Sequence, residues 1–211
     1  MRYENASFHR KKTIADSFKN LLLVKSFDKI TITDIVKDCG INRKTFYYHF
    51  EDIYALLQWM LEQEAIDIVK NLDLTANYKE AIGFVLDYVD QNDKILNNIC
   101  HSIGRDHLKQ FFYLDFIEIT RSLVDLAEKT EGHKIPEDFK AFLVRFYTEA
   151  IAGMLIQQII EPSSDNHNEL IEYYYLTLSS AIPGAINALK NNIPSAIILS
   201  PEEYERLSDI E

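Results

Sequence analysis

Cysteine is scarce in this chain of 211 residues. The two cysteines, Cys39 and Cys100, lie far apart and match no spacing that is typical of zinc sites or redox pairs. No apolar run approaches the ~20 residues that a membrane-spanning helix needs, and no apolar stretch follows the basic N-terminal residues as it would in a signal peptide. We therefore expect a cytoplasmic protein with reduced thiols that does not enter a membrane.

Glycine and proline are also few, with 6 and 5 residues in the whole chain. They fall between segments of helical apolar periodicity rather than inside them, and the alternation typical of strands is scarce. This pattern predicts an all-α fold. Besides two short helices within 31–50, it predicts longer helices at roughly 9–25, 52–70, 77–90, 92–100, 106–130, 137–161 and 167–191.

The sequence motifs of several enzyme classes are missing as well. The chain has no glycine-rich phosphate loop, no Gly-x-Ser-x-Gly elbow, no His-Glu-x-x-His motif and no set of Glu-x-x-His pairs. Cys100, His101 and His107 form only a lone cluster. We therefore predict no enzymatic activity, no cofactor and no metal, and keep a small helical enzyme as a distant alternative.

Negative charge dominates the composition, with a formal net charge of −11. The excess is uneven, because residues 1–50 contain ten basic and five acidic side chains whereas the rest of the chain contains 12 and 28. Such asymmetry indicates two modules with different partners, and nucleic acid is the expected partner of a basic module. Taken alone, the charges fit chance clustering on a solvated surface equally well.

The segment from Thr31 to Phe50 has the signals of two helices joined by a tight turn. Thr31 can cap the first helix, with Asp34 three positions later completing a variant capping box. Gly40 can adopt a left-handed conformation and end that helix, and Asn42 is a strong cap for the next one. The segment therefore predicts a helix-turn-helix.

The second of these helices has one apolar and one polar side. Phe46 and Phe50 lie four residues apart and are expected to face the core. The other side gathers arginine, lysine, tyrosine and histidine, which can contact guanine edges or phosphates in a DNA groove. The candidate contacts to double-stranded DNA are Thr31, Thr33, Asn42, Arg43, Lys44, Thr45, Tyr47, Tyr48 and His49. For Tyr48 and His49, a purely structural role between helices remains open.

Residues 8–60 resemble the DNA-binding domain of TetR-family transcriptional regulators, whose pattern is D-I-x-x-x-x-G-V/I-x-x-x-T-x-Y-x-H-F. The run NRKTFYYHF followed by YALLQWM is similar to a DhaS-like subgroup of dihydroxyacetone-kinase regulators. The resemblance implies a recognition helix from about Arg43 to His49, with Thr45, Tyr47 and His49 at the positions of the family's DNA contacts. Many relatives carry a lysine at the start of the fourth helix, where this chain has Glu51 and Asp52.

The resemblance also implies a C-terminal helical domain that dimerises and often holds an inducer. We expect a DNA-binding domain at 1–52, a regulatory and dimerisation domain at 53–192 and a tail at 193–211. Candidate dimer-interface residues are Phe142, Phe146, Ile151, Leu155, Leu170, Tyr174, Leu178 and Ile182. Candidate ligand-binding residues are Trp59, Tyr88, His107, Tyr113 and Phe116, although an aromatic stripe is more often ordinary core.

The expected function is that of a repressor that binds a pseudo-palindromic operator as a homodimer and is released by a small-molecule inducer. The alternative is a DNA-binding co-regulator that receives its signal from a partner protein.

Overall fold

The structure, a computed structural model, describes residues 2–66, 74–132, 134–162 and 167–190. Within these ranges the protein is all-α and contains no strand. Its elements are α1 (Arg2–Leu22), the 3-10 turn η1 (Phe27–Lys29), α2 (Ile32–Asp38), α3 (Arg43–His49), α4 (Ile53–Leu61), the π-helical turn η2 (Glu62–Ile66), α6 (Leu74–Gln91), α7 (Asp93–Ile103), α8 (Arg105–Glu131), α9 (Glu137–Ile160) and α10 (His167–Lys190).

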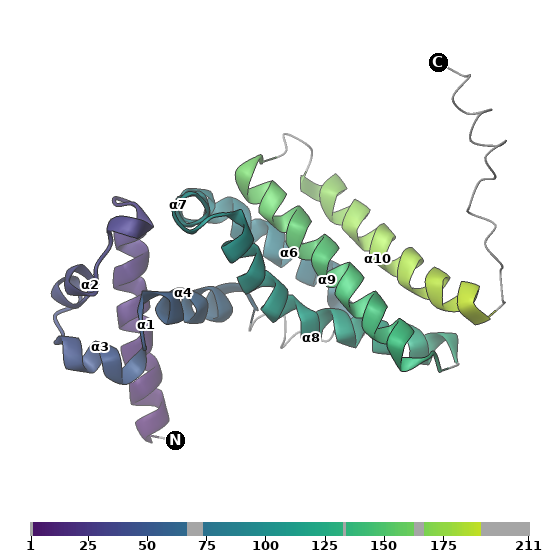
Figure 1. Ribbon diagram of the computed structural model, residues 1–211, viewed down its shortest axis with the longest axis horizontal. Helices are drawn as coiled ribbons and strands as arrows, with labels where there is room; N and C mark the ends of the chain where they lie inside the picture. Colours follow the sequence, from purple (N-terminus) through teal and green to yellow (C-terminus); the bar gives the residue numbers. More distant parts are fainter. Residues whose placement is uncertain (1, 67–73, 133, 163–166, 191–211) are drawn as a thin grey trace, which may run out of the picture.

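The helices form two groups that lie at opposite ends of an elongated molecule (Figure 1). The helices α1, α2 and α3 form a small bundle at one end, and α4 leads from it toward a larger bundle of α6 to α10. The long helices α8 and α9 pack along one another, and α10 packs against α6 and α8. The three-helix bundle and larger helical domain expected from the sequence are confirmed.

Some predicted helix boundaries differ from the structure. The first helix begins at Arg2 and ends at Leu22, earlier at both ends than predicted, and Leu23 and Val24 after it are exposed. The helix predicted at 52–70 consists of α4 and the π-helical turn η2, after which the described residues stop at 66. The predicted tail at 193–211 lies outside the described residues.

Proline and glycine are not confined to the loops. Pro183 lies inside α10, and Gly83, Gly153 and Gly184 lie inside α6, α9 and α10. Proline has no N–H group, so α10 lacks the hydrogen bond that residue 183 would otherwise donate one turn back. The expectation that these residue types fall only between helices was therefore wrong.

One continuous cluster of buried side chains joins the two groups of helices. It includes Phe18 on α1 and Leu57 on α4, and it extends through α6, α7 and α8 to Ile156 on α9. A second cluster at the far end packs Val124 of α8 against α9 and Ile186 of α10. The small bundle and the large one are thus connected by packed side chains.

Two sets of polar contacts link α1 to the larger bundle. Asn98 on α7 donates hydrogen bonds to the carbonyls of Leu22 at 2.6 Å and Lys25 at 2.8 Å, and its own carbonyl accepts one from the N–H of Phe27 at 3.0 Å. One turn earlier on α1, Lys19 pairs with Glu64 at 2.6 Å, and the Tyr88 hydroxyl on α6 donates to the same carboxylate.

None of the helices in the described ranges combines the length and the hydrophobicity of a membrane-spanning segment. In the same ranges, no three His, Cys, Asp or Glu side chains are placed together so that they could hold a metal ion.

Candidate nucleic-acid interface

A capping box fixes the start of α2. The Thr31 hydroxyl accepts a hydrogen bond from the N–H of Asp34 at 3.2 Å, and the Asp34 carboxylate accepts one from the N–H of Thr31 at 2.8 Å. Lys25 pairs with the same carboxylate at 2.7 Å. The hydrogen bond from Lys25, and then those from Thr31, hold the pKa of Asp34 well below its usual range. The predicted capping box is confirmed, and its carboxylate stays ionised at physiological pH.

The turn between α2 and α3 depends on a left-handed glycine. Gly40 has a φ of 67°, a conformation that other residues adopt only with strain. It lets the N–H of Ile41 reach back to the carbonyl of Val36 at 2.9 Å, which forms a Schellman motif. The Asn42 side chain then accepts a hydrogen bond from the N–H of Thr45 at 2.8 Å and caps α3. The predicted roles of Gly40 and Asn42 are confirmed.

Apolar anchors and one buried hydroxyl hold α2 and α3 on α1. Phe46 and Phe50 of α3 are buried, as predicted. On α1, the buried Ser17 hydroxyl lies 2.7 Å from the Asp38 carboxylate and 3.3 Å from the carbonyl of Ile35, both on α2. Because α2 and α3 are both packed against α1 on their inner sides, the position of the outer side of α3 is fixed.

The outer side of α3 is polar, basic and aromatic. Tyr47 is 50% exposed and Tyr48 is 82% exposed, and Arg43 and Lys44 are exposed beside them. The Arg43 guanidinium lies 3.4 Å from the Tyr47 hydroxyl and 6.0 Å from the centre of its ring. It also reaches the Thr33 hydroxyl on α2 at 3.5 Å. Arg43 therefore connects the exposed side chains of the two helices, and because it is itself exposed, its remaining donors are accessible to a base edge or a phosphate.

His49 ends α3 and is half-buried, with its ring 5.0 Å from that of Tyr48. Burial, and then the positive charges of Lys11 and Arg10, lower the pKa of His49. The imidazole is therefore largely neutral at physiological pH in the free protein. Because Lys11 and Arg10 belong to α1, this helix contributes positive charge to the same region of the surface as α3.

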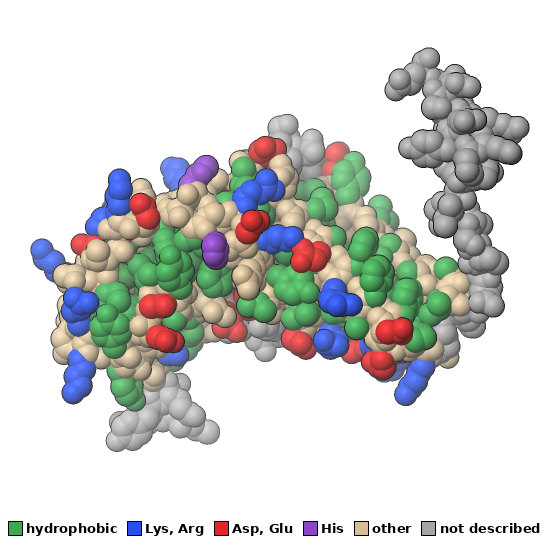
Figure 2. All heavy atoms as spheres, viewed as in Figure 1, with side chains coloured by type: hydrophobic (Ala, Val, Ile, Leu, Met, Phe, Trp, Pro, Cys, Tyr) green, Lys and Arg blue, Asp and Glu red, His purple; other side chains and the backbone are tan. Residues whose placement is uncertain are grey.

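The surface charge follows this arrangement. Lys and Arg side chains project from the end of the molecule that carries α2 and α3, whereas acidic side chains are frequent along the larger bundle (Figures 1 and 2). A basic end on an acidic body turns that end toward the phosphates of a duplex. The asymmetry seen in the sequence is thus an asymmetry between the two ends of the molecule.

Three candidate DNA contacts also take part in helix caps. Thr31 caps α2, Asn42 caps α3, and the Thr45 hydroxyl lies 3.1 Å from the Asn42 carbonyl oxygen. The structure contains a further cap that was not predicted from the sequence. The Asp52 carboxylate accepts a hydrogen bond from the N–H of Ala55 at 2.8 Å and caps the start of α4. The signal was present, since an aspartate directly before an apolar run is typical of a helix start.

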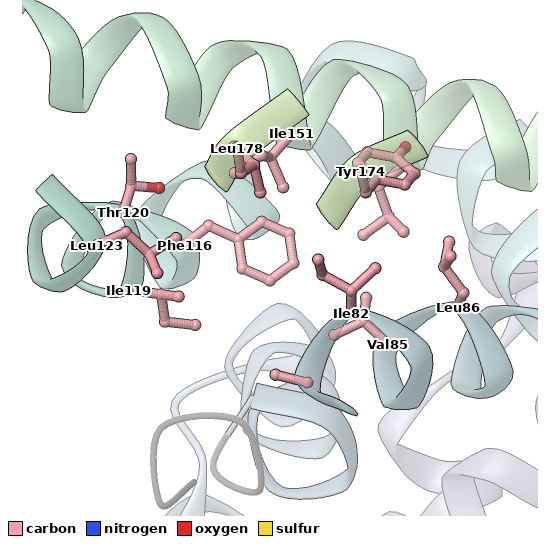
Figure 3. Close-up of a pocket in the computed structure, with 12 residues that line it drawn as sticks. Ile82, Val85, Leu86, Phe116, Ile119, Thr120, Leu123, Ile151, Tyr174 and Leu178 are labelled. Atoms are coloured by element: carbon pink, nitrogen blue, oxygen red, sulfur yellow. The ribbon is translucent and has the colours of Figure 1, made fainter. Parts of the chain in front are cut away.

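The larger bundle contains a cavity of about 80 Å³ between α6, α8, α9 and α10 (Figure 3). Phe116 alone among the five candidate ligand-binding residues lines it. Trp59 packs within the small bundle, Tyr88 bonds to Glu64, His107 is exposed and Tyr113 lies at the edge of the main core. These four side chains are aromatic, but they lie on sides of their helices that do not face the cavity.

Some of the candidate dimer-interface residues are buried inside the protomer, and others are exposed. Leu155, Leu178 and Ile182 are buried inside the protomer and cannot form an interface between two copies. Leu155 and Leu178, together with the half-buried Ile151 and Tyr174, instead line the cavity. Leu170 is half-buried against the main core. Phe142 and Phe146 are 51% and 55% exposed on the outer side of α9.

Comparisons with known proteins agree with this geometry. Residues 16–60 match the family model of bacterial regulatory proteins of the tetR family, and residues 76–180 match that of a transcriptional regulator C-terminal region. A curated relative, the HTH-type dhaKLM operon transcriptional activator DhaS of Lactococcus lactis subsp. lactis (strain IL1403), is 24% identical over 153 residues, which are 72% of this chain and 81% of the relative.

A solved structure, the dihydroxyacetone kinase operon activator DhaS, shares the fold with a TM-score of 0.65 at 22% sequence identity, over 82% of this chain and 96% of that one. These relatives are transcriptional regulators, not enzymes. The two family models cover the helix-turn-helix and most of the larger bundle, in the order in which the structure places them. The chain therefore belongs to the TetR family of DNA-binding transcriptional regulators.

Proposed function

We propose that this protein binds a pseudo-palindromic operator as a homodimer, placing one copy of α3 in each of two successive major grooves. It represses transcription until an effector binds in the larger bundle. The observation that carries the proposal is the outer side of α3, where Arg43, Lys44, Tyr47 and Tyr48 are exposed on a helix anchored by Phe46 and Phe50. A seven-residue helix alone buries too little surface for specific affinity, so two copies are needed.

The exposed apolar side chains of α9 and α10 support the homodimer. Phe142, Phe146 and Met154 project from α9, and Tyr173 and Leu176 project from α10, each more than half exposed. Hydrophobic side chains reach the surface over both helices (Figure 2). Single exposed apolar residues are common, but a row of them on two long helices is typical of an interface. Two copies joined through these helices form a four-helix contact and direct both copies of α3 to one side.

Selection of bound fragments from genomic DNA tests the proposal. We expect an inverted repeat with half-site centres about 34 Å apart, one helical turn. Arg43→Ala should weaken binding by about 1–3 kcal/mol and relax the preference at one base position, as expected for a base contact. Tyr47→Phe should weaken binding to all DNA sequences by the same factor, as expected for a phosphate contact. Recovery of fragments without any inverted repeat would contradict operator binding by a dimer.

The dimer is tested separately by sedimentation. Phe146→Asp should produce monomers and abolish operator binding, because a charge would be buried without a partner at the interface. Leu114→Asp is the matched control, since Leu114 is equally exposed at 56% but lies on α8. Equal effects of the two substitutions would argue against an interface on α9.

A second candidate function is that of an activator signalled by a partner protein. The similarity to DhaS, whose name describes a transcriptional activator, favours it. A reporter gene behind the recovered operator separates the two, because a repressor lowers its expression and an activator raises it. Calorimetry with small molecules, compared with capture of proteins from cell lysate, then identifies the source of the signal.

A further inference from the structure

We propose that the cavity between α6, α8, α9 and α10 binds a small, uncharged, largely apolar molecule with one hydrogen-bonding oxygen, a hydroxyl or a carbonyl. This inference rests on the proposed function, because it names the chemical class of the effector. The cavity is lined by Ala81, Ile82, Val85, Leu86, Phe116, Ile119, Thr120, Leu123, Ile151, Leu155, Tyr174 and Leu178.

The lining excludes charged ligands. None of these twelve side chains carries a charge, and burying an ionised group without a partner is strongly unfavourable. Burial raises the pKa of the Tyr174 hydroxyl to about 12, so Tyr174 is uncharged as well. Aliphatic and aromatic side chains converge from four helices, which is the usual composition of a site for an apolar molecule.

One fully buried polar atom in this lining has no partner among the described residues. Thr120 is 0% exposed, and its hydroxyl makes no hydrogen bond with any described residue. Figure 3 shows that this hydroxyl lies on the side of Thr120 that faces Ile151 and Leu178, across the cavity. A buried hydroxyl without a partner is costly, so a ligand oxygen that bonds to it is favoured over a purely apolar ligand.

A second buried threonine shows that a helix does not by itself leave a threonine hydroxyl without a hydrogen bond. Thr148 on α9 is also 0% exposed, but its hydroxyl donates to the carbonyl of Val144 at 2.7 Å, one turn back. A threonine in a helix can usually make this bond. Thr120 does not make it, so its hydroxyl keeps an unused donor and acceptor beside the cavity.

The volume limits the size of the molecule. A water molecule needs about 10–15 Å³ of such space, so a cavity of about 80 Å³ holds roughly five to eight non-hydrogen atoms. Phenol and toluene fall within this range. They have nearly the same shape and differ in a hydroxyl against a methyl group, so together they separate the polar contact from apolar filling.

The experiment measures binding of phenol and of toluene to the full chain, without DNA, by ligand-observed NMR titration. We expect the protein to prefer phenol. Thr120→Val keeps the shape of the side chain and removes its hydroxyl, so the preference should shift toward toluene by about 3- to 10-fold, the worth of one hydrogen bond. Thr148→Val is the matched control and should leave the preference unchanged. Val85→Phe, which fills the cavity from α6, should abolish binding of both compounds.

Three results would overturn the inference: no binding of either compound, an unchanged preference in Thr120→Val, or an equal shift in Thr148→Val. If Thr120→Val does not fold, as judged by circular dichroism, competition between the two compounds in the unaltered protein, together with the loss of both in Val85→Phe, decides whether they occupy this cavity. Operator binding is measured on the same samples without ligand. Loss of ligand binding with intact operator binding refutes only this inference, whereas absence of operator binding refutes the proposed function.

Discussion

Two buried threonines on neighbouring helices allow the cost of an unpaired hydroxyl to be measured at the scale of single residues. Thr120→Val removes a hydroxyl without a partner, and we expect the free energy of unfolding to rise by about 1 kcal/mol. Thr148→Val removes a bonded hydroxyl, and we expect a fall of about 0.5–1.5 kcal/mol. Urea unfolding of both variants measures the difference. Changes of the same sign would show that the two hydroxyls are in equivalent surroundings.

His49 should couple DNA binding to protons. In the free protein its pKa is lowered by burial and by Lys11 and Arg10, so the neutral form dominates at pH 7. A DNA phosphate beside the ring would favour the protonated form, and the complex would take up a proton. Operator affinity should therefore rise as pH falls from 7.5 to 6, by at most about tenfold per pH unit for each His49, or about a hundredfold for the two copies in a dimer.

Fluorescence anisotropy at several pH values measures this dependence, with His49→Gln as the variant that cannot titrate. An equally steep pH dependence in His49→Gln would assign the effect to another group. The folding stability of the free protein should depend on pH in the opposite direction from operator affinity. The unfolded chain binds more protons than the folded one below the ordinary histidine pKa of about 6.5, so folding stability falls as pH drops through that value.

At the scale of elements, one amide makes the polar contacts between α7 and the segment at the end of α1. Asn98 satisfies the carbonyl of Leu22 at the end of α1, which has no partner within the helix, the carbonyl of Lys25 in the turn that follows, and one N–H of η1. We expect Asn98→Ala to lower the free energy of unfolding by about 1–3 kcal/mol, because partly buried backbone groups lose their partners. Asn97→Ala is the control, since Asn97 is its half-buried neighbour on α7. Thermal unfolding of both variants tests this, and equal losses would contradict it.

The elements that could be predicted from sequence are those fixed by local chemistry. The caps at Thr31 and Asn42 and the turn at Gly40 each depend on residues within a few positions, so the helix-turn-helix was predicted almost completely. The cavity depends instead on four helices that are distant in sequence. Periodicity identified Leu155 and Leu178 as apolar, but it did not show whether they face the protomer core or a second copy.

The helix α9 shows why periodicity could not separate core positions from interface positions. It buries Val144 and Ile156 on one side and exposes Phe142 and Phe146 on the other. A helix that is apolar all round has no single stripe from which its orientation can be predicted. The aromatic residues misled for a related reason, because Trp59 and Tyr88 were chosen by residue type, whereas the actual lining is mostly aliphatic.

At the scale of the whole molecule, the core does not divide at residue 52. The helix α4 packs against α1, and the match to the family's DNA-binding model continues to residue 60. We propose that the boundary between the two domains lies in the π-helical turn η2, whose Glu64 pairs with Lys19 of α1 and accepts from Tyr88 of α6. The turn is then in contact with both domains.

The opposite charges of the two ends predict a steep dependence on salt. Each phosphate neutralised contributes about −0.9 to the logarithmic slope of affinity against salt. Glu51 is exposed between α3 and α4, and unlike Asp52 it caps no helix. Glu51→Lys should strengthen binding to all sequences and steepen the slope by up to about 1.8 in a dimer.

Titrations at several salt concentrations measure the slope. Glu137 lies at the start of α9, far from α3 (Figure 1). Glu137→Lys makes the same change of charge and should leave the salt slope unaltered. An unchanged slope in Glu51→Lys would mean that the start of α4 does not lie beside the DNA backbone.

The two sides of α9 have a consequence for the dosage of the regulator. Ile151 and Leu155 on this helix line the cavity, and Phe142 and Phe146 on the same helix are the proposed contacts to a second copy. A molecule in the cavity that shifts α9 would therefore alter how tightly two copies associate. Association depends on concentration by mass action. A cell with few copies would respond to the effector by losing dimers, whereas a cell with many copies would keep its dimers and respond only through their shape. The strength of the response would then depend on how much regulator the cell makes.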